Sequence, residues 1–395
     1  MTNHILCIGG EDHNFRIPFL LGLRNFGYRV TAAGTGNGAP FAKAGIDYRA
    51  FRFHRFTNPA GDFSAIRQIR TMITDVRPDV VQSFDTRPNL LVPLAARGLG
   101  AVRVVRTING MGWVFSSRGV MALILRPAYC WLHQFASKST ALTVFQNRED
   151  QTFFADRGMA APDRHRLIAG SGVDVERFEA MRAAGPSREE LRETLGVTDL
   201  EVVMTVTRLT RQKGIATLLA AADHVRTVRP NVRFVLVGPL ESEGPMAITK
   251  AEIDAHAPHV VWIGPQTNIP AYLAAADVFA FPTEYREGVP RVLLEASLAG
   301  LPMVTTRMPG CSDVVEDGLT GLLVPQRSPK MLANGIVRLL QDRATASTMG
   351  QRARKRVIRD FSLELTLHRY SEAYRELLSR PMNEAAPDDL RSVEA

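Results

Sequence analysis

Residues 277–300 read DVFAFPTEYREGVPRVLLEASLAG, and their pattern changes twice. The apolar run at the start predicts a buried strand and the polar stretch after it predicts a loop. Pro290 is typical of the first turn of a helix, which is predicted to run to Gly300. Glu287 lies in the loop and Glu295 lies inside the apolar helix. A carboxylate inside an apolar helix is costly unless something binds it, so the pair marks a candidate site.

Short apolar runs alternate with amphipathic stretches along the whole chain. Further strands are predicted at 4–10, 28–34, 79–84, 102–108, 141–147, 201–209, 232–238, 259–264, 302–306 and 321–325. Such alternation predicts parallel sheets covered by helices on both faces. Because the pattern restarts after a polar stretch, we predict an α/β chain with two Rossmann-like domains that face each other across a cleft.

The predicted domains cover residues 1–170 and 171–360, with the linker and boundary near 169–200. An amphipathic helix at 361–380 is predicted to pack back on the first domain. The polar end of the chain, 381–395, has no periodicity and is predicted to be a flexible tail.

The net charge of +8 lies in the first half of the chain. Residues 1–172 hold 21 lysines and arginines against 11 acidic residues, while the remainder holds 27 against 29. A basic half predicts an anionic partner, such as nucleic acid, an anionic membrane surface or a phosphorylated substrate. A surplus for solubility is the alternative.

Three widely spaced cysteines match no disulfide or metal spacing, which indicates a reducing compartment. The N-terminus lacks the pattern of a secretion signal, and no apolar run is long enough to span a membrane. These features predict a cytoplasmic protein.

The segment VTRLTRQKG follows the first strand of the second domain. Its two cations, Arg208 and Lys213, converge on one strand-to-helix turn and suit a diphosphate. The helix that follows Pro290 offers free N–H groups for phosphate, and ionised glutamates accept bonds from hydroxyls. A sugar nucleotide offers both groups. In the alternative, Glu287 only complements the helix dipole, Glu295 pairs with a buried arginine, and the cations belong to a solvated loop.

The first domain offers a glycine pair and a mixed helix. Gly9 and Gly10 follow the first strand, where glycine lets the backbone approach a ligand closely; a tight turn is the alternative. Residues 112–138 mix aromatic, apolar and basic side chains, Trp113 and Arg118 among them. That mixture is typical of a helix in a membrane interface, although a core helix with a basic edge is also consistent.

The chain resembles a GT-B glycosyltransferase of family 4, the retaining, nucleotide-sugar-dependent group. The resemblance covers about residues 165–360 and rests, in order, on VTRLTRQKG, LVGP, IGPQTNIPAYLAAADVFAFPTEYREGVPRVLLEASLAGLPMVTT and PGCSDVVEDGLTGLLVP, preceded by SGVDVERF between the domains. YREGVPRVLLEA, RTINGMGWVF and TVFQNREDQTFF are similar to enzymes that extend polyprenyl-diphosphate-linked sugars in bacterial surface polysaccharide or glycoprotein assembly.

The resemblance implies which residues bind the donor: Gly9, Gly10, Gly238, Arg208, Lys213, Glu287, Gly288, Val289, Pro290 and Glu295. In that family the two cations hold the diphosphate. The first glutamate of the pair touches the transferred sugar and the second binds the ribose hydroxyls. Gly9 and Gly10 form the loop beneath the donor phosphates.

The first domain departs from the family pattern. Many members carry histidines near the positions where this chain has Phe84, Asp85 and Asn109. Asp85 is our candidate for a group near the acceptor hydroxyl. The predicted catalytic residues are therefore Glu287, Arg208, Lys213 and Asp85.

The implied function is retaining transfer of a hexosyl or N-acetylhexosaminyl group from a nucleotide sugar, with UDP expected, to a polyprenyl-diphosphate-linked or similar glycan. The acceptor places the enzyme on the anionic inner face of the cell membrane. No metal or cofactor is expected, because the paired cations stabilise the leaving diphosphate. Two alternatives remain: a 2-epimerase-like GT-B enzyme, and a non-enzymatic protein that binds an anionic ligand. Nucleic acid is not expected as a partner.

Overall fold

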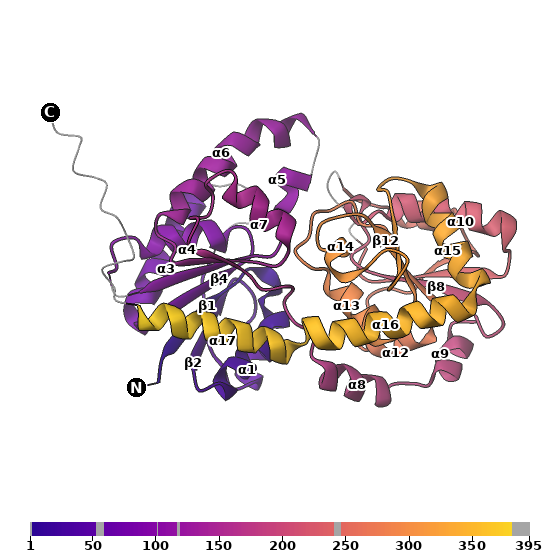
Figure 1. Ribbon diagram of the computed structural model, residues 1–395, viewed down its shortest axis with the longest axis horizontal. Coiled ribbons are helices and arrows are strands. Elements are labelled where there is room, and N and C mark those ends of the chain that lie inside the picture. The colour runs from indigo at the N-terminus through magenta and orange to yellow at the C-terminus, as the bar shows by residue number, and fades with distance from the viewer. Residues whose placement is uncertain (1, 53–58, 101, 117–118, 241–245, 381–395) are drawn as a thin grey trace. The chain divides into compact units, whose positions relative to one another are not determined.

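The computed structural model describes residues 2–52, 59–100, 102–116, 119–240 and 246–380 (Figure 1). The chain divides into two compact units: unit 1 comprises Met1–Ala169 and Glu364–Ala395, and unit 2 comprises Gly170–Leu363. The predicted flexible tail, 381–395, lies outside the described residues.

Unit 1 is built on a parallel seven-stranded sheet in the order β3-β2-β1-β4-β5-β6-β7. The strands are β1 (His4–Ile8), β2 (Arg29–Gly34), β3 (Asp47–Ala50), β4 (Val80–Phe84), β5 (Arg103–Ile108), β6 (Leu142–Phe145) and β7 (His165–Leu167). The central strands are buried, which explains their near-continuous apolar sequences. The edge strands β3 and β7 are partly exposed and lack such runs, so the sequence pattern did not predict them.

The helices of unit 1 are η1 (Glu11–Arg16), α1 (Ile17–Asn25), α2 (Ala39–Lys43), α3 (Pro59–Val76), α4 (Pro88–Ala96), α5 (Gly112–Ser116), α6 (Val120–Ser137), α7 (Arg148–Ala155) and α17 (Leu363–Ser379). The last helix returns from the end of the chain to this sheet (Figure 1). The Tyr370 and Thr107 hydroxyls lie 2.8 Å apart, and the Tyr374 hydroxyl donates to Gln82 Oε1 at 2.8 Å. Both tyrosines are buried, so α17 is an integral part of the core of unit 1.

Unit 2 is built on a parallel six-stranded sheet in the order β10-β9-β8-β11-β12-β13. The strands are β8 (Glu201–Val206), β9 (Val232–Val237), β10 (Val260–Trp262), β11 (Val278–Phe281), β12 (Met303–Thr306) and β13 (Leu322–Val324). This is the order of a doubly wound fold. The prediction of two α/β domains with parallel sheets is therefore confirmed.

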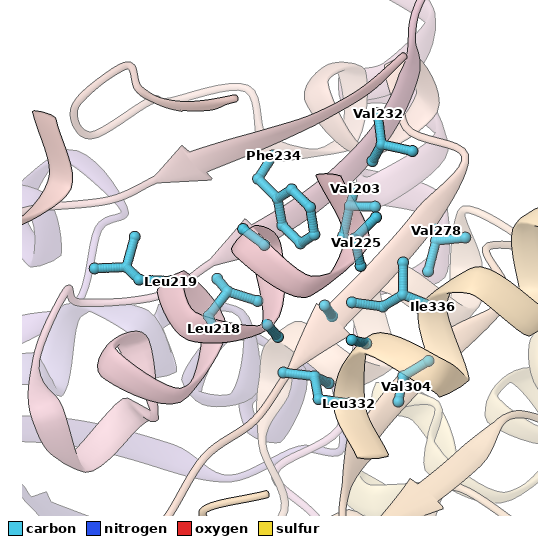
Figure 2. Packing of buried hydrophobic residues seen from close by; sticks show 14 of the residues in the cluster. Val203, Leu218, Leu219, Val225, Val232, Phe234, Val278, Val304, Leu332 and Ile336 are labelled. Carbon is cyan, nitrogen blue, oxygen red and sulfur yellow. The ribbon is translucent and has the colours of Figure 1, made fainter. Parts of the chain in front are cut away.

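The helices of unit 2 are α8 (Val175–Ala183), α9 (Arg188–Thr194), η2 (Arg211–Lys213), α10 (Ile215–Val228), α11 (Lys250–Asp254), α12 (Ile269–Ala275), α13 (Arg291–Leu298), α14 (Cys311–Val314), α15 (Pro329–Gln341) and α16 (Arg343–Phe361). Figure 2 shows Leu218 of α10 and Ile336 of α15 packed over Val203 and Val304 of the sheet. Each fully buried side chain of this size contributes about 1.5–3 kcal/mol.

The helix predicted from Pro290 to Gly300 is shorter at both ends. Pro290 is the N-cap residue, with ψ 115°, so α13 begins at Arg291. The helix ends at Leu298, and Gly300 has a φ of 72°, which a right-handed helix does not accommodate. In the described ranges, no helix combines the length and the apolar character that a membrane span requires.

The order of the strands positions the loops that carry the candidate residues. It reverses between β1 and β4 in unit 1 and between β8 and β11 in unit 2. Ligands of open α/β sheets bind outside the carboxyl ends of the strands at such points. Gly10 and Asp85 follow β1 and β4, while Lys213 and Glu287 lie in the segments after β8 and β11.

Candidate functional site

Lys213 and Glu287 meet at the switch point of unit 2. Lys213 Nζ donates to Glu287 Oε1 at 2.6 Å, and Thr283 Oγ1 lies 3.4 Å from the same oxygen. The lysine and glutamate side chains are 13% and 19% exposed. Because the pair is largely removed from water, its electrostatic interaction is stronger than that of a surface ion pair.

Gly214 allows this pair to form. It stands between η2 and α10 with a φ of 73°, and a Cβ atom there would lie 1.8 Å from the carbonyl oxygen of Pro282. Only glycine therefore lets the segment after β8 pack against the end of β11. The Glu284 N–H donates to the Gln212 carbonyl at 2.8 Å and ties the same two loops together.

Arg208 and Tyr285 lie within electrostatic range of the pair. Burial raises the pKa of Tyr285 to about 12, Glu287 acts in the same direction and Arg208 opposes it. The ammonium of Lys213 lies 5.5 Å from the centre of the Tyr285 ring, within the range of a cation–π contact. The sequence analysis missed Tyr285, although it lies two positions before Glu287 in the segment that drew attention first.

The other predicted donor-binding residues of unit 2 surround these loops. Gly238 has a φ of 136°, and a Cβ there would lie 1.9 Å from the Thr207 carbonyl oxygen, so glycine brings the end of β9 against the segment after β8. Gly288, Val289 and Pro290 are buried just before α13. Their contacts with a donor stay a prediction.

Glu295 is paired with an arginine of its own helix. Arg291 Nε donates to Glu295 Oε1 at 3.0 Å, and the two side chains are 38% and 20% exposed. Burial raises the pKa of Glu295 above its usual value, although Arg291 acts against this. Its partner is therefore an arginine, as in the alternative, but one that is partly exposed and not buried. The role of Glu295 toward a ribose stays a prediction.

Asp85 is the centre of a polar cluster at the switch point of unit 1. Its Oδ2 accepts the Gly10 N–H at 2.9 Å. Its Oδ1 accepts Arg16 Nη2 at 2.8 Å and Asn109 Nδ2 at 2.9 Å. One carboxylate therefore ties together the loops that follow β1, β4 and β5.

These contacts accompany an uncommon backbone conformation and a lowered pKa at Asp85. Its φ is 69°, in the left-handed region that few residues other than glycine adopt. Burial opposes its ionisation, but Arg16 and the Gly10 N–H outweigh this effect and lower the pKa of Asp85. The N–H of Gly10, predicted to lie beneath donor phosphates, is donated to Asp85 here. The role of Asp85 near an acceptor stays a prediction.

His13 is a second residue that the sequence analysis missed. It is buried beside Gly9, where a Cβ atom would lie 2.1 Å from His13 Nδ1, and its ring stacks on Phe41 at 5.3 Å. Burial and the charge of Arg16 lower its pKa to about 3. Glycine at position 9 therefore makes room for a neutral imidazole under the loop.

Among the side chains that the structure describes, no group of three or more His, Cys, Asp or Glu is placed to hold a metal ion.

Two family models match the chain. The model for the glycosyl transferase 4-like domain matches residues 20–170, and the model for glycosyl transferases group 1 matches residues 187–356.

Individual proteins agree with these matches. The UDP-Gal:alpha-D-GlcNAc-diphosphoundecaprenol alpha-1,3-galactosyltransferase of Escherichia coli is 25% identical, over 80% of both chains. The GDP-mannose-dependent alpha-(1-6)-phosphatidylinositol monomannoside mannosyltransferase of Mycobacterium tuberculosis (strain CDC 1551 / Oshkosh) is 30% identical, over 73% of both chains. The crystal structure of Anabaena HepE in complex with UDP has the same fold. Its TM-score is 0.76 at 18% identity, over 95% of this chain and all of that one.

Two doubly wound units and these matches define a glycosyltransferase of the GT-B type. The chain belongs to the group 1 glycosyl transferases and carries a 4-like first domain, which confirms the predicted resemblance to GT-B enzymes of family 4. It is an enzyme, and the non-enzymatic alternative was wrong.

Proposed function

We propose that this glycosyltransferase moves a sugar from a nucleotide sugar, with UDP as the nucleotide, to a polyprenyl-diphosphate-linked saccharide, and that the anomeric configuration is retained. The observation that carries the proposal is the contact between Lys213 and Glu287 at the switch point of unit 2. Retention is proposed because family 4 is the retaining group.

The donor half rests on the charges around that contact. Lys213 and Arg208 supply positive charge where the nucleoside diphosphate departs, which stabilises the transition state most when water is excluded. The bond from the anomeric carbon to the phosphate oxygen breaks, and the acceptor oxygen bonds to that carbon from the same face. The acceptor proton passes to the departing phosphate oxygen. In this proposal the two cations make a divalent metal unnecessary.

The acceptor half rests on the relatives. The Escherichia coli relative is named for a diphosphoundecaprenol-linked acceptor, and the mycobacterial relative for a phosphatidylinositol mannoside. Both names describe a saccharide on a phosphorylated lipid. A polyprenyl chain is anchored in a bilayer, so we propose that the enzyme works in the cytoplasm, on the anionic inner face of the cell membrane.

The test is a donor and acceptor matrix with the purified full chain. UDP-glucose, UDP-galactose, their N-acetylated forms and GDP-mannose are each offered with undecaprenyl-diphosphate-linked GlcNAc and with phosphatidylinositol mannoside. Nucleotide release, product mass and the anomeric proton coupling are measured. We expect acceptor-dependent release of UDP and an α-linked product. Turnover only with GDP-mannose and the inositol lipid overturns the proposal, and conversion of a UDP-sugar without acceptor indicates an epimerase.

A matched pair of variants tests the site. Lys213→Ala is expected to lower kcat by about 100-fold or more, the usual loss when one transition-state donor is removed. Lys250→Ala removes an exposed lysine that pairs with Asp254, and it is expected to change kcat less than twofold. Equal activity of the two variants is incompatible with the proposed role of Lys213.

A further inference from the structure

The exposed apolar side chains of this protein concentrate on one helix. Seven of the thirteen large apolar side chains that are exposed in the described ranges belong to α6. We use the term α6 outer face for six of them, which are 38–73% exposed: Val120, Met121, Leu123, Ile124, Leu125 and Trp131. Large apolar side chains exposed in such number on one helix indicate an interaction site.

The opposite face of α6 anchors the helix to unit 1. Its buried residues are Ala122, His133 and Ala136, two of which are small and one polar. Arg126 Nε donates to the Val114 carbonyl at 3.0 Å and joins α6 to α5. A surface helix ordinarily buries its large apolar residues and exposes its polar ones. Here that distribution is inverted, so the outer face is not explained by the packing of the unit.

The sequence on both sides of α6 carries basic residues and no acidic ones. No aspartate or glutamate occurs in residues 86–148, a run of 63 positions that holds eight lysines and arginines. Three exposed cations lie near the C-terminal part of α6. Arg97 stacks on Phe135 at 5.0 Å, Lys138 follows the helix directly, and the Arg157 carbonyl accepts a bond from Gln134 of α6. The outer face is therefore apolar with a basic rim.

We propose that the α6 outer face inserts into the interface of an anionic lipid bilayer. Exposed apolar side chains, an aromatic residue and an excess of basic over acidic side chains form the combination that binds such a surface. The exposed Trp131, stacked on Phe135 at 5.7 Å, suits the headgroup level of a membrane. A second copy of the chain is a poorer partner, because a two-fold interface through this face would bring like charges together.

This inference rests on the proposed function, because a lipid-linked acceptor is what brings the enzyme to a bilayer. The exposure of α6 and the basic residues around it do not depend on catalysis. Of the predicted interfacial segment 112–138, residues 117–118, and Arg118 with them, lie outside the described residues, as does the side chain of Trp113.

The first experiment is co-sedimentation of the full chain with vesicles of phosphatidylcholine alone and of phosphatidylcholine with 30% phosphatidylglycerol. We expect binding to the anionic vesicles that weakens with salt but persists, because insertion of the outer face is less sensitive to screening than the basic rim. The double variant Ile124→Gln/Trp131→Gln is expected to lower the partition coefficient at least tenfold. The matched control is Val228→Gln, since Val228 is 64% exposed and Ile124 65%.

Two results overturn the proposal: absence of wild-type binding to anionic vesicles at low salt, or equal binding by the double variant and Val228→Gln. Light scattering adds a third. A wild-type dimer that the double variant dissociates, without vesicle binding, assigns the face to a second copy of the chain.

A final comparison separates this proposal from the proposed function. Lys213→Ala is expected to bind vesicles like the wild type while losing turnover. The double variant is expected to keep turnover of an acceptor with a short, water-soluble prenyl chain and to lose it with the long-chain acceptor in vesicles. Vesicle binding without transfer by the wild type defeats the proposed function alone, whereas transfer without vesicle binding defeats this inference alone.

Discussion

Replacement of Asp85 by asparagine separates a structural role of this residue from a catalytic one. The carboxylate accepts three hydrogen bonds, from the Gly10 N–H, Arg16 and Asn109. An asparagine amide has only one acceptor oxygen, so its NH₂ group must face at least one of these donors. Asparagine also adopts the left-handed backbone conformation, so the change leaves the backbone almost unperturbed.

The expected cost follows from these contacts. Loss of the charge-assisted bond to Arg16 costs about 1.5–3 kcal/mol, and a donor left without an acceptor costs about 1–3 kcal/mol. Arg16 is 14% exposed but Asp85 is 32% exposed, so water recovers part of this loss. We expect unit 1 to lose about 3 kcal/mol, which lowers its Tm by about 6–12 °C.

Calorimetry and urea titration at pH 7 measure this loss. The control is Asp62→Asn, because Asp62 is 31% exposed and pairs with Arg87 alone, at 2.5 Å; it is expected to cost at most about 1 kcal/mol. The folded pKa of Asp85 is lowered, so its stabilisation is present above its unfolded pKa and disappears as the pH falls through the folded value. The gap between wild type and variant should therefore close below about pH 4.

The measured kcat decides the role. If Asp85 only holds the loops, the variant retains most of its kcat at a temperature where it is folded, and its KM for the donor rises. A variant with unchanged Tm and a kcat lowered at least 100-fold would refute this reasoning and favour the predicted role near the acceptor.

Three further predictions concern stability. Gly214→Ala should abolish activity and destabilise unit 2 by more than its control Gly264→Ala, which is expected to cost roughly 1–2 kcal/mol. Both glycines have a φ near 73°, but only a Cβ atom at position 214 would clash with Pro282. Urea unfolding midpoints of the two variants measure the difference. His13→Asn should flatten the loss of stability between pH 6.5 and about 3. There the unfolded imidazole takes up a proton that the folded one does not, and urea titrations at several pH values measure the slope. Asp277→Ala should cost unit 2 about 3–5 kcal/mol by calorimetry, since it leaves three arginines without their shared carboxylate.

The strands of this fold could be predicted because most of them are buried on both faces. A strand such as β8 or β11 is a short run of apolar residues between polar loops, and that signal is contained within a few positions. The edge strand β3 was missed for the same reason, since an exposed strand does not need apolar residues.

The candidate site was predicted unevenly. Lys213 and Glu287 could be identified from their places at strand ends, yet their contact spans 74 positions in the chain. It forms because β8 has two neighbours in the sheet. One is β9, the next strand in the sequence, and the other is β11, whose following loop carries Glu287. The polar cluster around Asp85 was not predicted, because the three groups that donate to this carboxylate follow strands that only the sheet brings together.

The sequence by itself determined the α/β class, the central strands, the apolar and basic composition of the segment that contains α6, and the enzyme family. Each of these depends on residues that are close together along the chain. Tertiary structure alone decided which strands are neighbours, which carboxylate meets which cation, and which face of α6 remains uncovered. These features depend on the packing of whole sheets and helices, whose free energy is shared among residues far apart in the sequence.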